Sequence, residues 1–267
     1  MRCALAICLI FGSFLASSRP VTAEDIVSFE SRGNTIRGLL NKPSEAPRAV
    51  IILLAGGHGR LAIGADGTLS ALSQNQLVRT RAQYLQFGLA TLTLDLASDL
   101  HREHDDRLTY ATRFVADAAV VIRAMRAIAE PVVVAGTSRG SLRAAMALSK
   151  STGAERPDAV VFTSAYLMPN GDLPAIQTIV GSPETLPATL IVHHREDACP
   201  DTPPEAVAPF RAWAGSIVRV IWLEGGQGDG NPCQADSPHG FSGLDPVVVE
   251  VVSRWVLTLP PQKGMQP

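Results

Sequence analysis

Short, continuous apolar runs recur along this chain, and segments with helical spacing separate most of them. A strand that is apolar along its whole length is buried on both faces, as in parallel sheets. Strands that alternate with helices are joined by right-handed crossovers, which place helices on both faces of one sheet. The sequence therefore predicts an α/β fold with a mostly parallel central sheet. The runs predict strands over residues 49–54, 89–94, 132–135, 159–163, 189–193 and 218–223.

Apolar residues at helical spacing indicate four helices between or after these strands. The last of them is rich in valine, but its length, its apolar spacing and Pro246 near its start favour a helix over a strand. Polar and apolar residues alternate over 26–40 around Gly33-Asn34, which predicts a β-hairpin. The helices are expected over residues 73–87, 110–129, 140–150 and 246–259.

Composition and charge exclude several classes of protein. The chain has 267 residues and is 46% apolar and 18% charged, which is typical of a globular protein with a sizeable core. Its formal net charge of −2 gives no sign of a nucleic-acid-binding surface or a basic membrane patch. No repeat, low-complexity tract or linker divides the sequence, so we expect one domain over residues 24–267. These features leave the oligomeric state open.

The first 23 residues have the pattern of a secretory signal peptide. Arg2 supplies a positive charge, residues 3–15 are almost wholly apolar, and Val21-Thr22-Ala23 offers small residues where a signal peptidase reads them. We expect cleavage after Ala23 and export to the periplasm or the exterior. A short membrane anchor is the alternative, but the apolar stretch is too short to span a bilayer.

Cleavage there removes Cys3 and Cys8 and leaves Cys199 and Cys233 in an oxidising compartment. Two cysteines in such an environment are expected to form a disulfide. Two separate buried thiols are the alternative. A metal site is disfavoured, because neither cysteine has a second one two to four residues away.

A possible nucleophile follows the strand predicted at 132–135, in the sequence Gly136-Thr137-Ser138-Arg139-Gly140. A serine in such a strand–turn–helix adopts a strained backbone that projects its hydroxyl above the sheet edge. The residues two positions away on either side must be small, because larger side chains would collide within the turn. The following helix N-terminus also favours developing negative charge. The pattern predicts Ser138 as a nucleophile, and the alternative is a serine that merely caps a helix.

The order of motifs resembles that of the α/β-hydrolase superfamily. In that family the order is nucleophile, acid and histidine, each placed just after a strand. The resemblance covers essentially the whole mature chain and implies the α/β-hydrolase fold. It rests on the strand at 50–54 with its glycine-rich exit, the serine turn, His193-His194-Arg195-Glu196-Asp197, and Ser237-Pro238-His239-Gly240-Phe241.

By that order the resemblance implies Asp197 as the acid and His239 as the base. Family members also use glutamate, so Glu196 stays open as the acid, and Asp201 is a more distant candidate. The expected disulfide would join the loop that follows the acid to the loop that precedes the base. Such a bridge would hold the two side chains in register.

Stabilisation of a tetrahedral intermediate needs two N–H donors aimed at the developing oxyanion. One is expected to be the backbone N–H of Arg139, the residue after the nucleophile. The resemblance places the second at Gly57 or His58, in a loop that also contains Gly56 and Gly59. A glycine-rich turn without a catalytic part is the alternative. A phosphate loop is not indicated, because no Gly-Lys-Ser/Thr follows.

Together these residues predict a serine hydrolase that cleaves small or medium carboxylic esters through an acyl-enzyme, without a cofactor or a metal. The stretch between the strands near 163 and 189 is too short for a large helical cap. The chain thus resembles compact, lid-less esterases and dienelactone-hydrolase-like enzymes, with a small acyl substrate as partner. An amidase or peptidase with the same triad and a binding protein on a hydrolase scaffold are the alternatives. The cluster at 101–106 is interpreted as a solvated loop.

Overall fold

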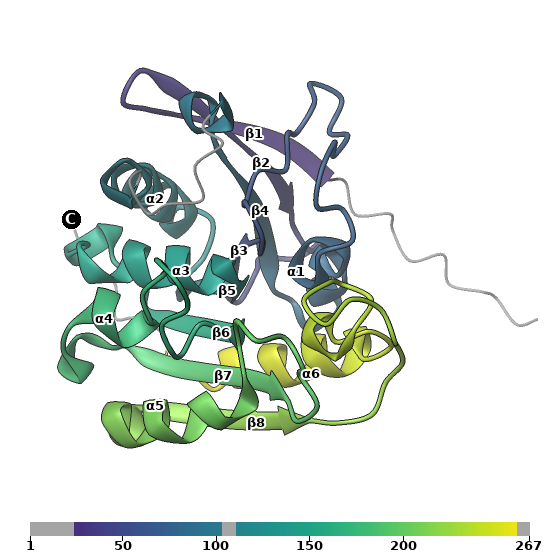
Figure 1. The fold of residues 1–267 in the computed structure, drawn as a ribbon. Coiled ribbons are helices and arrows are strands. Elements are labelled where there is room, and N and C mark those ends of the chain that lie inside the picture. The colour runs from purple at the N-terminus through teal and green to yellow at the C-terminus, as the bar shows by residue number, and fades with distance from the viewer. Residues whose placement is uncertain (1–23, 103–110, 261–267) are drawn as a thin grey trace, which may run out of the picture.

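A computed structural model of the chain describes residues 24–102 and 111–260. Within these residues, eight strands form one sheet in the order β1-β2-β4-β3-β5-β6-β7-β8 (Figure 1). The β1–β2 and β2–β4 pairs are antiparallel and all the other pairs are parallel, as predicted. The strands are β1 Glu24–Ser31, β2 Asn34–Asn41, β3 Val50–Leu54, β4 Ala90–Ala97, β5 Val132–Ser138, β6 Ala159–Ala165, β7 Ala188–His194 and β8 Val218–Leu223.

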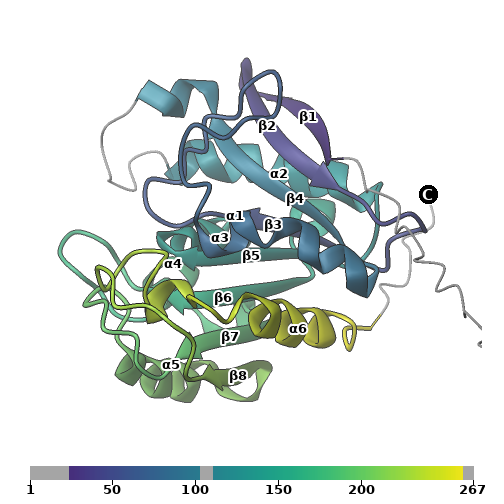
Figure 2. The same ribbon diagram turned by 90° about the vertical axis from the view of Figure 1, so that its right-hand side faces the viewer.

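Helices cover both faces of the sheet, with α2, α3, α4 and α5 on one face and α1 and α6 on the other (Figure 2). The α-helices are α1 Gln76–Arg79, α2 Ala111–Arg126, α3 Arg139–Ser149, α4 Ile176–Val180, α5 Val207–Ala214 and α6 Asp245–Val256. Short 3₁₀ helices span Arg81–Phe87, Ser98–Arg102, Gly153–Glu155, Pro183–Thr185, Pro204–Ala206, Gly215–Ile217 and Pro238–Gly240.

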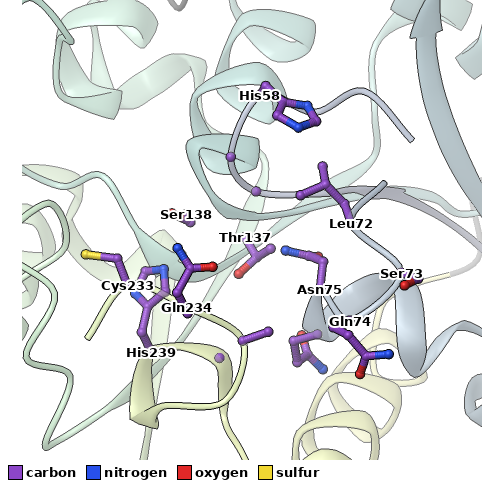
Figure 3. A pocket seen from close by; sticks show the side chains of 15 residues that line it. His58, Leu72, Ser73, Gln74, Asn75, Thr137, Ser138, Cys233, Gln234 and His239 are labelled. Atoms are coloured by element: carbon purple, nitrogen blue, oxygen red, sulfur yellow. The ribbon is translucent and has the colours of Figure 1, made fainter. Parts of the chain in front are cut away.

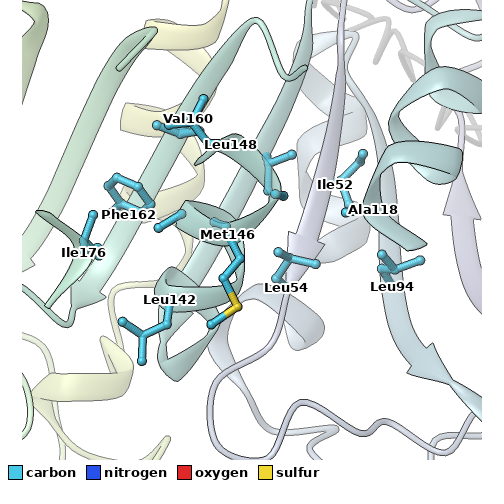
Figure 4. Close-up of a cluster of buried hydrophobic side chains, with 14 of the residues drawn as sticks. Ile52, Leu54, Leu94, Ala118, Leu142, Met146, Leu148, Val160, Phe162 and Ile176 are labelled. Atoms are coloured by element: carbon cyan, nitrogen blue, oxygen red, sulfur yellow. The ribbon is translucent and has the colours of Figure 1, made fainter. Parts of the chain in front are cut away.

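Two hydrophobic layers follow from the alternation of side chains along each strand. In β3, Val50, Ile52 and Leu54 belong to the layer under α2 and α3. Ile51 and Leu53 belong to the layer under α1 and α6. Figure 4 shows the first layer, in which side chains of α3 lie beside those of β3 and β6. The β3 strand is buried on both faces, which explains why it reads as one apolar run in the sequence.

The helix predicted over 73–87 is shorter than expected and is interrupted. α1 begins only at Gln76, because the backbone of Asn75 is not helical (φ −56°, ψ 137°). The Thr80 hydroxyl donates a hydrogen bond to the Gln76 carbonyl (2.7 Å), and bonds of this kind bend helices. The chain continues as a 3₁₀ helix that ends, as predicted, before Gly88, whose backbone is left-handed (φ 71°).

β4 is longer than the predicted strand and runs through Asp95 to Ala97, so Asp95 does not end it. The buried Asp95 carboxylate accepts backbone N–H hydrogen bonds from Leu61 (2.7 Å) and Ile63 (3.1 Å). These bonds replace the solvation that the carboxylate loses on burial. The strand can therefore pass through a charged residue that reads as a boundary in the sequence.

The predicted hairpin is present, but its turn residues are Arg32 and Gly33 rather than Gly33 and Asn34. Both turn residues have positive φ (54° and 73°), as a two-residue hairpin turn with the twist of the strands requires. Asn34 already pairs with Ser31 in the ladder. The final helix is present as α6 and ends at Val256, short of the predicted end.

The connection from β6 to β7 contains α4, which is five residues long, and no large cap domain appears among the described residues. Apolar spacing does not predict α4, because one turn of helix sets up no clear period. The expected absence of a large cap is thus confirmed. In the described part of the chain, no helix is both long and apolar enough to cross a membrane. The predicted signal peptide and residues 103–106 lie outside the described residues.

Candidate active site

Ser138 lies where β5 passes into α3, and its backbone is strained (φ 51°, ψ −128°). Glycines on both sides make this turn possible. A Cβ on Gly136 would lie 2.3 Å from the Gly140 carbonyl oxygen, and a Cβ on Gly140 would lie 2.3 Å from the Leu54 carbonyl oxygen. Both contacts are with backbone, which cannot shift without a large cost in energy. Only glycine therefore fits at these two positions, in agreement with the sequence pattern.

The turn is held in place by Ser141. Its hydroxyl donates a hydrogen bond to the Ser138 carbonyl (2.6 Å) and accepts one from the backbone N–H of Tyr166 (3.1 Å). These bonds tie the first turn of α3 to the residue that follows β6. The first turn of α3 carries no acidic side chain, so the positive end of the helix dipole near Ser138 is not neutralised from within the helix.

His239 and Asp197 come from separate loops and meet beside β7. Asp197 follows β7, and His239 lies in the 3₁₀ helix Pro238–Gly240. His239 Nδ1 is 3.0 Å from Asp197 Oδ2, and the two residues are only 5% and 4% exposed. Exclusion of water strengthens a hydrogen bond of this kind.

The two other candidate acids lie elsewhere. Glu196 is exposed at the surface. The Asp201 carboxylate accepts hydrogen bonds from the Tyr166 hydroxyl and the Asn170 amide. Burial and the hydrogen bond to Asp201 raise the pKa of Tyr166 to about 12, so the phenol stays protonated. Asp197 is the carboxylate that the fold places against His239.

Ser138 and His239 line one pocket with a volume of about 480 Å³. Gly57 and His58, the expected oxyanion residues, line it as well. Figure 3 shows the carboxamides of Asn75 and Gln234 pointing into this pocket. As far as the described residues define it, the lining has no aspartate, glutamate, lysine or arginine.

Solved structures with a similar fold include a dienelactone hydrolase from Anabaena variabilis, at 17% identity and a TM-score of 0.62 over 88% of this chain and 97% of that one. The chain has the α/β-hydrolase fold. A serine hydrolase without a lid from Xanthomonas campestris is similar at 14% identity and a TM-score of 0.58, over 91% of this chain and 99% of that one. A thermophilic esterase from Thermogutta terrifontis is similar at 14% identity and a TM-score of 0.56, over 90% and 95% of the two chains. No protein-family model matches the sequence, and no curated protein matches it.

In this α/β-hydrolase fold the loop after β3 is a tight turn that forms part of the pocket lining. The Gly59 N–H donates to the Gly56 carbonyl (3.1 Å), and Gly57 has a left-handed backbone (φ 55°). The buried guanidinium of Arg143 donates to the Ala55 carbonyl and fills the space beside Gly59. A Cβ on Gly59 would lie 2.5 Å from that guanidinium. The loop therefore packs against the Arg143 side chain, which the sequence does not single out.

Thr202, which the sequence also does not single out, completes the hydrogen bonds of Asp197, the candidate acid. Its hydroxyl donates to Asp197 Oδ2 (3.0 Å) and lies 3.0 Å from His239 Nδ1. The other carboxylate oxygen accepts the backbone N–H of Cys199 (2.9 Å). Both oxygens of Asp197 thus have partners. The contact arises from the loop after β7, which turns back through a hydrogen bond from the Thr202 N–H to the Cys199 carbonyl.

Ser164 anchors the backbone of the histidine loop to the sheet. It lies near the end of β6 with a positive φ of 42°. Its buried hydroxyl donates a hydrogen bond to the His239 carbonyl (2.7 Å). The strained backbone of Ser164 and its buried hydrogen bond together fix the position of the His239 backbone, and therefore of its imidazole. No local pattern points to Ser164, because its partner is far away in the sequence.

Cys199 and Cys233 form a disulfide, as predicted. The bridge joins the loop that carries Asp197 to the loop that leads to His239, and Cys233 lines the pocket. In the described part of the chain, both cysteines and Asp201 form a cluster of possible metal ligands. The two sulfurs are bonded to each other, so they are not thiolates and do not offer a metal the ligands that it needs.

His193 is a second imidazole close to Asp197, and it faces the same carboxylate oxygen as His239. It is fully buried, its Nδ1 is 3.9 Å from Asp197 Oδ2, and its ring packs against Trp222 with centroids 5.7 Å apart. Burial lowers the pKa of His193, and the nearby Asp197 charge opposes the shift. The imidazole is therefore kept neutral beside the acid.

Proposed function

We propose that this chain is a serine hydrolase that cleaves carboxylic esters through an acyl-enzyme on Ser138. The observation that carries the proposal is that Ser138 and His239 line one pocket while His239 Nδ1 is hydrogen-bonded to Asp197 Oδ2. With Nδ1 facing the carboxylate, Nε2 is the nitrogen that can take the proton of the serine hydroxyl. Asp197 holds the imidazole in this tautomer and stabilises the imidazolium that forms.

In the acylation step, the Ser138 oxygen forms a bond to the carbonyl carbon of the ester, and its proton passes to His239 Nε2. The π electron pair of the carbonyl moves onto its oxygen, which becomes the oxyanion. When this intermediate collapses, the pair returns to the C=O bond and the bond to the alcohol oxygen breaks. The alcohol leaves with the proton from His239.

The oxyanion would be stabilised by backbone N–H groups beside the pocket. We assign one donor to Arg139, which follows the nucleophile, and the other to Gly57 or His58. The placement of Gly57 and His58 in the lining of the pocket supports this assignment. Water then attacks the acyl-enzyme, with His239 as its base, and the acid is released.

The pocket favours a small or medium ester without a charge near the scissile bond. Its lining, as described, carries no carboxylate or cationic side chain, and its volume of about 480 Å³ is modest. Among the described residues, the short α4 connection supplies no large lid over the pocket. Solved structures with this fold include esterases, among them the one from Thermogutta terrifontis, which supports the choice of an ester substrate.

Hydrolysis of p-nitrophenyl acetate and butyrate by the wild type and by Ser138→Ala tests the proposal. We expect turnover by the wild type and a loss on the order of 10⁴-fold or more in the variant. A rate in Ser138→Ala close to that of the wild type would contradict it. The matched p-nitroanilide separates an esterase from an amidase, because a faster anilide reaction would reverse the assignment.

We also propose that the protein is exported after cleavage behind Ala23. β1 begins at Glu24, whose carboxylate accepts a hydrogen bond from the Asn41 amide (2.9 Å) and pairs with Arg81. A cut behind Ala23 would keep Glu24–Ser31 and these contacts of Glu24 in the mature chain, which we propose is a single domain over 24–267. The disulfide fits an oxidising compartment. N-terminal sequencing of the protein expressed in a bacterial host should give Glu24 in the extracytoplasmic fraction, and an uncleaved cytoplasmic chain would contradict the proposal.

A further inference from the structure

Asn75 directly precedes α1 but does not cap it. Asparagine at this position normally accepts a hydrogen bond from the first turn of the helix, worth about 1 kcal/mol. Here the side chain makes no cap hydrogen bond. The backbone carbonyl of Asn75 accepts the N–H groups of Val78 and Arg79 (2.9 Å each), so the main chain is fixed while the carboxamide is turned elsewhere. It lines the pocket that contains Ser138.

The amide nitrogen of Asn75 and the side chain of Ser138 both lie close to Gly56. A Cβ built on Gly56 would lie 3.1 Å from Ser138 Cβ and 3.3 Å from Asn75 Nδ2. The Ser138 side chain and the Asn75 amide nitrogen therefore both lie within contact distance of this one position. Figure 3 shows the nitrogen end of this carboxamide directed toward Thr137 and Ser138. Gly56 immediately precedes Gly57, one of the two residues expected to supply an oxyanion donor.

The oxygen end of the Asn75 carboxamide is not accessible from the pocket. Asn75 Oδ1 is buried and has no hydrogen-bond partner among the described residues. An unpaired buried acceptor costs about 1–3 kcal/mol, in addition to the cap bond that is not made. Because the oxygen is buried, a substrate can reach only the N–H₂ end. Arrangements that sacrifice stability in this way are expected at functional sites.

We propose that Asn75 is a catalytic residue whose Nδ2 donates a hydrogen bond to the oxyanion formed during attack by Ser138. This rests on the proposed function. As the Ser138 oxygen bonds to the carbonyl carbon and the π pair moves onto oxygen, the Asn75 N–H₂ group stabilises the new charge beside the backbone donors. When the pair returns to the C=O bond, this hydrogen bond weakens again. Asn75 exchanges no proton in either step.

Steady-state kinetics of Asn75→Ala and Asn75→Asp on p-nitrophenyl acetate test the proposal. Loss of one oxyanion donor typically lowers kcat about 10²- to 10³-fold, and KM should change by no more than about threefold. Asn75→Asp keeps the shape but replaces the donor with a carboxylate that repels the oxyanion, so it should lose at least as much. Gln86→Ala, which removes an exposed carboxamide from the neighbouring 3₁₀ helix, is the matched control and should retain wild-type kcat.

Melting temperatures separate this account from a structural one. Asn75→Ala removes no cap bond and relieves an unpaired buried oxygen, so its Tm should equal or exceed that of the wild type. A lower Tm with a matching loss of folded protein would assign Asn75 to stability and overturn the proposal. A wild-type kcat in Asn75→Ala, or full activity in Asn75→Asp, would also overturn it. An ester-inactive wild type, or an active Ser138→Ala, would instead overturn the proposed function.

Discussion

The Thr202 hydroxyl donates a hydrogen bond to Asp197 Oδ2, the same oxygen that faces His239 Nδ1, with both distances at 3.0 Å. The acid is therefore held by a side chain from its own loop as well as by the imidazole. Because hydrogen bonds to a charged group are stronger than neutral ones, this contact restricts how the carboxylate can rotate. In the proposed mechanism Thr202 is a positioning residue that acts on the base through the acid.

Thr202→Val tests this role. The variant keeps the shape of the side chain but removes the donor, and a hydrogen bond to a charged group is worth about 1.5–3 kcal/mol. We expect kcat/KM for p-nitrophenyl acetate to fall about 10- to 100-fold. Thr202→Ser keeps the hydroxyl and should restore most of the rate. Equal activity in the valine and serine variants would remove Thr202 from the account.

Gly140→Ala tests the packing of the serine turn. The new Cβ would lie 2.3 Å from the Leu54 carbonyl oxygen, so the turn must move and both Tm and activity should fall sharply. Gly171→Ala is the control, since its Cβ would meet nothing within 4 Å although its φ is 55°. The control should lose only about 1–2 kcal/mol, the cost of a left-handed backbone. Similar Tm values for the two variants would contradict the packing argument.

The disulfide should support both stability and activity. Its cysteines are 34 residues apart, and closure of such a loop stabilises by about 4 kcal/mol in the chain-entropy model. For a domain of this size that corresponds to roughly 10 °C in Tm. The double variant Cys199→Ser/Cys233→Ser should therefore melt lower and turn over more slowly, because the loops of Asp197 and His239 lose their link. Thermal melts and ester kinetics unchanged from the wild type would refute this.

Burial of His193 predicts how stability depends on pH. Because burial lowers its pKa in the folded state below the usual 6.5, the unfolded chain binds more protons as the pH falls through that value. The free energy of unfolding should therefore decrease on acidification below about pH 6.5, and this loss should level off below the folded-state pKa. His193→Gln removes the titrating group. Urea unfolding at about pH 7.5 and about pH 5.5 should show a smaller loss in the variant, and an identical loss would contradict the assignment.

Continuous apolar runs predicted the sheet well, because a strand that is buried on both faces is apolar at almost every position. β8 has the predicted bounds, Val218–Leu223, and the predicted runs lie in β3 to β7 almost entirely. The effects of charged and hydroxyl side chains that form hydrogen bonds to the backbone are harder to predict from the sequence. Asp95 lies within β4, and Thr80 interrupts the helix predicted over 73–87, in each case through a hydrogen bond that apolar spacing does not register.

Some residues of the candidate site could likewise be predicted from the sequence, and others could not. The order of motifs along the chain predicted Ser138, Asp197 and His239 as candidate site residues, because that order follows from how the strands are connected. Asn75 and Thr202 carry no such mark. Their contacts depend on where two loops place a carboxamide and a hydroxyl. Loops that place these groups against other partners could have a similar sequence pattern.

Labelling by a fluorophosphonate tests the central claim most directly, because the probe phosphonylates a serine only when an adjacent base activates it. Intact-mass and peptide mass spectrometry of the folded wild type should show one adduct, on Ser138. His239→Ala should be labelled far more slowly, and Ser138→Ala should not be labelled. An unlabelled wild type, or an adduct on another residue that persists in Ser138→Ala, would contradict the account.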